Sequence, residues 1–242
     1  MPTTNKTIDV KKLFFNYLQV LERNWRKIAT LTLLADIERY LCQDFAYFIC
    51  SQGQNRIKCG KRPIYAITDI GKRSRCFDLV LIKQAKKQNE KDLVFAVIEA
   101  KYATNYQKLP KFGYTTFDNI STNLKKLSEQ AASDIRGDGP LNRNFDIGIT
   151  SHNNYIYANM WACFKTKADA DPNLVEAEKK RFFGKIQAKA RENGLSWHGK
   201  KETPHLQTVF EDKLVHLGCQ QYRVTLKAGF WVVDRTLKLK AE

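Results

Sequence analysis

The chain lacks the signatures of several large protein classes. None of its apolar runs reaches the roughly 18 residues needed to span a bilayer. Residues 1–12 show no apolar core followed by a small-residue cleavage site, so the sequence predicts no signal peptide. There is no GxGxxG, no GxxxxGK(S/T), no GxSxG and no internal repeat. Dinucleotide enzymes, P-loop NTPases and serine hydrolases therefore lack their usual motifs here.

Metal-binding cysteine and histidine patterns are also missing. The cysteines form no CxxC pair and stand among apolar residues, which argues against a zinc site. We expect reduced, mostly buried thiols in a cytoplasmic protein. The four histidines show neither HExxH nor HxH spacing, and we expect structural or exposed roles for them. The cysteines are Cys42, Cys50, Cys59, Cys76, Cys163 and Cys219.

Acidic residues are scarce relative to basic ones. The 242 residues include 41 Lys and Arg but only 25 Asp and Glu, a formal net charge of +16. Such an excess favours a polyanionic partner, because phosphates that Lys and Arg neutralise release condensed counterions. Ribosomal and membrane-surface proteins share this property. The charge thus indicates a kind of partner without identifying a function.

The pattern of apolar residues predicts an α/β fold around a mixed sheet. In the helix expected over 27–50, the apolar stripe runs from Leu33 and Leu34 to Phe48. The runs 76–82 and 92–102 are apolar on both faces and are joined by a polar connector, so they predict a hairpin covered on both sides. Helices are expected over 9–25, 27–50, 118–136 and 173–192, a basic strand or hairpin over 54–75, and further strands over 144–151, 155–164, 221–228 and 230–240.

The hairpin brings acidic residues together. A turn centred between residues 88 and 89, inside the polar connector, places Asp78 opposite Glu99. Glu99 and Lys101 are two residues apart, so both side chains leave the same face of the strand. A slip of one residue would turn Asp78 to the other face. A Glu99–Lys101 pair on its own would be an ordinary surface salt bridge. Two carboxylates beside an ammonium instead suit a Mg²⁺ site, with Lys101 orienting an attacking water.

These residues resemble a known family. Asp78 followed by Glu99-Ala100-Lys101 on adjoining apolar strands resembles the PD-(D/E)xK nuclease superfamily, which has the restriction-endonuclease-like fold. Phe77 stands where the family's name has Pro, at a position that the family tolerates. The resemblance covers roughly residues 27–150. It implies an α-β-β-β-α-β core, with a mixed sheet flanked by helices, and Mg²⁺-dependent phosphodiester hydrolysis, with Mn²⁺ as a substitute.

The resemblance also implies further site residues. The family usually adds an acidic residue from the helix before the sheet, and Glu38 is our choice, with Asp36 and Asp44 as alternatives on the same helix. The metal ligands would be Asp78, Glu99, the Ala100 carbonyl and Glu38, and the catalytic residues would be Asp78, Glu99, Lys101 and Glu38. The family often adds a polar residue from the helix that follows the Glu-x-Lys strand. The first candidate for it here is Gln130, and the second is Lys126.

Two basic segments are candidates for nucleic-acid binding. The segment 54–75 precedes Asp78, and 179–201 interleaves Lys and Arg with Phe182, Phe183 and Trp197. The alternatives are a solvated hairpin for the first segment and an amphipathic surface helix for the second. The candidate contacts are Arg56, Lys58, Lys61, Arg62, Lys72, Arg73 and Arg75, together with Lys185, Lys189 and Arg191.

The sequence therefore predicts a Mg²⁺-dependent DNA endonuclease, most simply a standalone type II restriction-type enzyme. Cutting both strands of duplex DNA would favour a homodimer by symmetry. The alternatives are a nuclease-fold protein that binds nucleic acid without cutting it, and an RNA nuclease, repair nuclease or exonuclease of the same fold. We expect one domain, with a helical extension over 1–26, a catalytic core over 27–165 and a basic extension over 166–242 that packs on the core.

Overall fold

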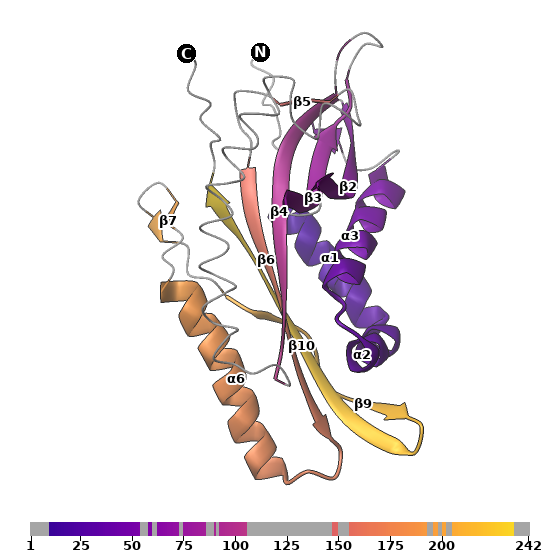
Figure 1. Cartoon of the computed structure of the whole chain (residues 1–242), viewed down its shortest axis with the longest axis vertical. Coiled ribbons are helices and arrows are strands. Elements are labelled where there is room, and N and C mark those ends of the chain that lie inside the picture. Colours follow the sequence, from indigo (N-terminus) through magenta and orange to yellow (C-terminus); the bar gives the residue numbers. More distant parts are fainter. Residues whose placement is uncertain are drawn as a thin grey trace.

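The fold combines helices with a large mixed sheet in a computed structural model (Figure 1). The structure describes residues 10–53, 58–59, 62–72, 75–85, 90, 92–105, 147–149, 155–192, 196–197, 200–201 and 205–234. The helices are α1 (Val10–Arg23), α2 (Trp25–Leu34), α3 (Glu38–Gly53) and α6 (Pro172–Glu192). The strands are β1 (Lys58–Cys59), β2 (Arg62–Lys72), β3 (Arg75–Lys83), β4 (Asp92–Thr104), β5 (Ile147–Ile149), β6 (Tyr155–Lys167), β7 (Ser196–Trp197), β8 (Lys200–Lys201), β9 (Gln207–Leu217) and β10 (Gln220–Asp234).

Eight of the described strands form one mixed sheet. Its order is β1-β2-β3-β4-β6-β10-β9, and β5 pairs with β4 outside this path. β4 runs parallel to β5 and β6, whereas the other neighbouring pairs are antiparallel. The predicted α/β class with a mixed sheet is therefore confirmed. The helix predicted over 118–136 lies outside the described residues.

Helices lie on both faces of the sheet, as β6 shows. Trp161 and Cys163 of β6 belong to the hydrophobic core that the sheet forms with α1, α2 and α3. Phe164, the next residue along, contacts Phe182 and Phe183 of α6 on the opposite face. In Figure 1, α1 to α3 and α6 accordingly stand on opposite sides of the sheet. Within the described part of the chain, no helix is long and apolar enough to cross a bilayer.

Aromatic side chains join the first described helix and the last described strand in one core. Phe14 of α1 is fully buried, with its ring 4.5 Å from that of Phe230 in β10 and 5.3 Å from that of Trp161, measured between ring centroids. Phe45 of α3 lies 5.5 Å from Phe14. Thus α1 and β10 pack into the same core as α3. The division into a core with two extensions stays a prediction.

The single helix predicted over 27–50 is wrong, because the chain breaks between α2 and α3. Ala35 is extended, with φ −155° and ψ 171°. The side chain of Asp36 accepts a hydrogen bond from the backbone N–H of Glu38, which favours the start of a new helix. Because of this break, Leu34 does not continue the apolar stripe and is 61% exposed.

The C-terminal strands also differ from the prediction. The sequence pattern missed β9, in which the positive φ of 46° at Asp212 and a register shift against β10 interrupt the alternation of buried and exposed residues. β10 is one continuous strand through Gly229, although two strands were predicted there. The predicted helix over 173–192 is confirmed as α6.

Lys179 fastens α6 to β9, and its loss is expected to destabilise the fold. Its side chain is 7% exposed, and its ammonium lies 2.7 Å from Glu176, 3.3 Å from Glu211 and 2.9 Å from Asp212. Burial alone would lower the pKa of Lys179, but hydrogen bonds to the three carboxylates raise it above the ordinary value. The pairing therefore stabilises the fold below the unfolded-state pKa of about 10.4 and is lost as the pH rises through the higher folded-state pKa.

We expect Lys179→Met to lower the free energy of unfolding by about 1–3 kcal/mol at pH 7. This is less than for a fully buried pair, because the three carboxylates are half exposed and can be solvated. Urea unfolding measures the difference. The matched control is Lys180→Met, since Lys180 is exposed on the same helix. Equal unfolding midpoints for the two variants would contradict this role for Lys179.

Candidate functional site

The candidate site lies where β3 and β4 separate. The described pairing of these strands ends at Leu79 and Ile98, while β4 continues to Thr104 beside β6. If the Leu79–Ile98 register continued by one residue, Asp78 would lie opposite Glu99, which is the pairing that the sequence predicts. Beyond this point, the backbone N–H and C=O groups on the edge of β4 that faces β3 need other hydrogen-bond partners.

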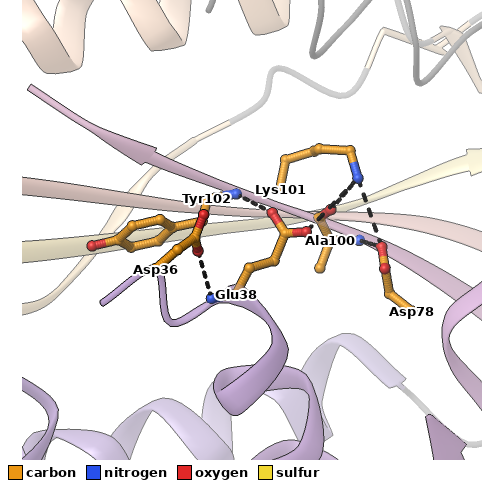
Figure 2. Close-up of polar contacts among 6 residues, drawn as sticks. All are labelled: Asp36, Glu38, Asp78, Ala100, Lys101 and Tyr102. Carbon is orange, nitrogen blue, oxygen red and sulfur yellow. Dashed lines mark hydrogen bonds and ion pairs between the residues drawn. The ribbon is translucent and has the colours of Figure 1, made fainter. Parts of the chain in front are cut away.

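Two carboxylate side chains, one of them from β3 itself, replace the backbone of β3 as partners of β4. Asp78 accepts a hydrogen bond of 2.7 Å from the backbone N–H of Ala100. Glu38, in the first turn of α3, accepts one of 2.6 Å from the backbone N–H of Tyr102. Ala100 and Tyr102 are two residues apart, so their N–H groups leave the same edge of β4. The two acidic side chains are thereby held at the fork between β3 and β4 (Figure 2).

Lys101 completes the site from the other side of β4. Its Nζ donates a hydrogen bond of 2.7 Å to the Ala100 carbonyl oxygen. The same Nζ lies 3.8 Å from Asp78 Oδ2 and 4.0 Å from Glu38 Oε1. All three charged side chains are about a quarter exposed. Figure 2 shows Lys101 reaching over the strand toward oxygens contributed by α3, β3 and β4.

Glu38 has an unusual protonation equilibrium. Its partial burial raises its pKa to about 7. The positive charge of Lys101 and the N–H of Tyr102 oppose this rise, whereas the negative charge of Asp78 adds to it. Glu38 therefore takes up or releases its proton close to neutral pH, which an exposed glutamate does not do.

The structure distinguishes among the three acidic candidates on the predicted helix. Asp44 accepts a hydrogen bond of 2.9 Å from the Tyr17 hydroxyl, beside the aromatic core. Asp36 accepts from the backbone N–H of Glu38 and so shapes the start of α3. Glu38 is the one whose carboxylate lies at the fork with Asp78 and Lys101.

The other predicted ligand, Glu99, is placed by its backbone alone. It pairs with Ala158 in the parallel register of β4 and β6, two residues before Lys101. Its side chain is outside the described ones. Gln130 and Lys126 lie outside the described residues altogether.

Most of the predicted phosphate contacts also fall outside the described side chains. Lys185 is exposed on α6, which packs on the sheet through Phe182 and Phe183. Lys189 and Arg191 lie in α6, and Lys58, Arg62, Lys72 and Arg75 lie in β1, β2 and β3, with side chains that are not described. Arg56, Lys61 and Arg73 are outside the described residues.

The sequence reasoning missed one residue that supports the site. The amide of Asn105 makes two hydrogen bonds of 2.8 Å with the backbone of Lys165, and so fastens the end of β4 to β6. Asn105 ends a long apolar strand, and a polar side chain at such a position is the signal that could have indicated this role. Its effect is to hold β4 on β6 past the fork.

Comparisons with known proteins do not identify the chain. No family model matches it, and neither the curated proteins nor the solved structures yield a match. Among the described residues, no group of three or more His, Cys, Asp and Glu side chains could hold a metal ion. The described oxygens at the fork come instead from two carboxylates, Asp78 and Glu38, and the Ala100 carbonyl. Such a donor set, with oxygen atoms and no thiolate or imidazole, suits Mg²⁺ or Mn²⁺.

Proposed function

We propose that this chain is a Mg²⁺-dependent DNA endonuclease related to the PD-(D/E)xK nucleases. The observation that carries the proposal is the convergence of Asp78, Glu38, Lys101 and the Ala100 carbonyl at the fork between β3 and β4. These residues come from α3, β3 and β4, and the hydrogen bond from the Tyr102 N–H to Glu38 joins positions 64 residues apart. An ordinary surface salt bridge would not explain why the Glu38 carboxylate of α3 accepts a hydrogen bond from the Tyr102 backbone N–H of β4.

The fold order supports the same proposal. Helix α3 is followed by β2, β3 and β4, and β6 then joins β4 in parallel. This sequence of elements matches the α-β-β-β-α-β order of the restriction-endonuclease-like core, provided that the helix expected over 118–136 is present. A parallel β4–β6 pair requires a crossover connection, which is where that helix would lie.

The acidic side chains would hold the metal. Asp78, Glu38 and the Ala100 carbonyl oxygen are its described candidates, and Glu99, two residues before Lys101, is the expected fourth. Bound there, Mg²⁺ would polarise the scissile phosphate and activate water. The hydrogen bonds from the Ala100 and Tyr102 N–H groups keep the Asp78 and Glu38 carboxylates oriented toward the fork, so their positions need no reorganisation on binding.

Lys101 would act on the attacking water and the phosphate. Its ammonium can donate hydrogen bonds to a water molecule and offset the charge that develops on phosphate oxygens. Lys185 and the basic residues of 54–75 would hold the DNA backbone. A type II restriction-type enzyme acting as a homodimer would cut both strands by symmetry.

Purified full-length chain tests the function directly. We expect nicking and linearisation of supercoiled plasmid in Mg²⁺ or Mn²⁺. We expect no products in EDTA, because without the cation the negative charges of the acidic side chains repel the phosphate. Labelled duplex DNA, single-stranded DNA and RNA are assayed side by side. Cleavage confined to RNA or to single strands would favour the other nucleases of this fold, and salt-sensitive binding without products would favour a binding protein.

A further inference from the structure

We infer that in the metal-free protein the Lys101 ammonium holds the place of a divalent cation, so that it must move off these oxygens, toward the attacking water, when a metal binds. This inference rests on the proposed function, since it concerns the same oxygens. It adds that Lys101 has two positions and that its positive charge competes with the metal.

The position of Nζ is the first support. A lysine side chain has a long flexible stem and would ordinarily extend into water. Lys101 instead turns back to the carbonyl of its own preceding residue, Ala100, at 2.7 Å. Ordering such a stem costs side-chain entropy, so an attraction must offset it.

The oxygens around Nζ supply that attraction. Asp78 Oδ2 at 3.8 Å and Glu38 Oε1 at 4.0 Å lie beyond hydrogen-bonding distance but within reach of a charge interaction. The ammonium therefore sits among three oxygens from three elements, with a hydrogen bond to one and a charge interaction with the other two. Those three oxygens are the described candidates for metal ligands.

Charge then decides what happens when a metal enters. A divalent cation coordinated by these oxygens would lie within a few ångströms of Nζ, where two positive charges repel strongly in partly buried surroundings. The Asp78 oxygen nearest to Nζ, Oδ2, is also the one that accepts the hydrogen bond from the Ala100 N–H. The contacts of the ammonium with Asp78 and Glu38 are too long for hydrogen bonds, whereas the hydrogen bond to the Ala100 carbonyl must break for Lys101 to move off these oxygens.

Calorimetric titration of the full chain with Mn²⁺, without DNA, tests this competition. We expect Lys101→Met to bind Mn²⁺ at least about tenfold more tightly than the wild type, because the competing charge is gone. Lys101→Arg keeps the charge and is expected to bind no more tightly than the wild type. Lys180→Met removes an exposed lysine of α6 and is expected to leave the affinity unchanged, which controls for net charge.

Two results would overturn the inference. One is a Lys101→Met affinity equal to or weaker than that of the wild type, and the other is an equal gain for Lys101→Met and Lys101→Arg, which would indicate bulk rather than charge. If either result accompanies Mn²⁺-dependent DNA cleavage by the wild type, the inference fails and the proposed function stands. If wild type and variants all fail to bind Mn²⁺ at millimolar concentration and the wild type cuts nothing, both fail.

Discussion

Replacing Asp78 with asparagine is expected to lower Mg²⁺-dependent plasmid cleavage by about 100- to 1,000-fold without unfolding the protein. The amide oxygen of Asn can still accept the hydrogen bond from the Ala100 N–H, so the fork keeps its shape. The negative charge beside Lys101 is lost, and with it one of the two described carboxylate donors for the metal. Removing one preorganised electrostatic group from an active site costs about this much.

Asp169→Asn is the matched control for this experiment. Asp169 is exposed in the turn between β6 and α6, outside the fork, and its replacement changes the net charge by the same amount. Initial cleavage rates and thermal unfolding midpoints are measured for wild type and both variants. Cleavage by Asp78→Asn at the rate of the wild type would remove Asp78 from the site. A large loss in Asp169→Asn would show that charge alone governs the assay.

Replacing Phe14 with alanine is expected to lower the free energy of unfolding by about 3–5 kcal/mol. Phe14 is fully buried, and its ring is stacked on Phe230 and meets those of Phe45 and Trp161. The substitution removes apolar contact area and leaves a cavity among large rings, which cannot easily close around it. The effect is large because Phe14 joins α1, α3, β6 and β10.

The control for Phe14 is Tyr47→Ala. Tyr47 lies on α3 but is 72% exposed, so its replacement is expected to change the free energy of unfolding by less than about 0.5 kcal/mol. Chemical denaturation of the three proteins measures both differences. An effect of Phe14→Ala as small as that of Tyr47→Ala would mean that α1 is a peripheral addition rather than part of the core.

The register of β3 on β4 beside the site was predictable because the polar connector over 83–91 marks where the turn lies. Burial does not select this register, since Leu79, Val80 and Leu81 are all buried and β3 is covered on both faces. That alignment fixes Asp78 opposite Glu99. The placement of Asp78 near Lys101 follows from alternation along the strands. The central part of the site could therefore be predicted from local rules.

The family resemblance could name Glu38 as a site residue, but the spacing of apolar residues could not place it. Apolar residues continue through 27–50 with helical spacing, so nothing in the periodicity marks the break at Ala35. The start of α3 has a local contact, the Glu38 N–H donating to Asp36, but the place of the Glu38 carboxylate is fixed by a tertiary one, the hydrogen bond from the Tyr102 N–H. A hydrogen bond between a glutamate of a helix and the backbone N–H of a distant strand does not affect the spacing of apolar residues along the chain.

β9 escaped prediction for a different physical reason. A strand is recognised by strict alternation, but Glu211 and Asp212 fall at an irregularity in the pairing with β10, where the residues on the two faces shift. Asp212 has a positive φ and accepts a hydrogen bond from Thr225 across the strands. A local bulge stabilised by hydrogen bonds between Asp212 and Thr225 is a feature that composition and periodicity do not encode.

The most direct test of the metal site is the anomalous scattering of Mn²⁺ in crystals of the full chain. The account predicts one Mn²⁺ peak at the fork, next to the Asp78 carboxylate and the Ala100 carbonyl, and the Lys101 ammonium moved off that carbonyl. A fork without anomalous density at millimolar Mn²⁺, with Lys101 still donating its hydrogen bond to Ala100, would contradict it.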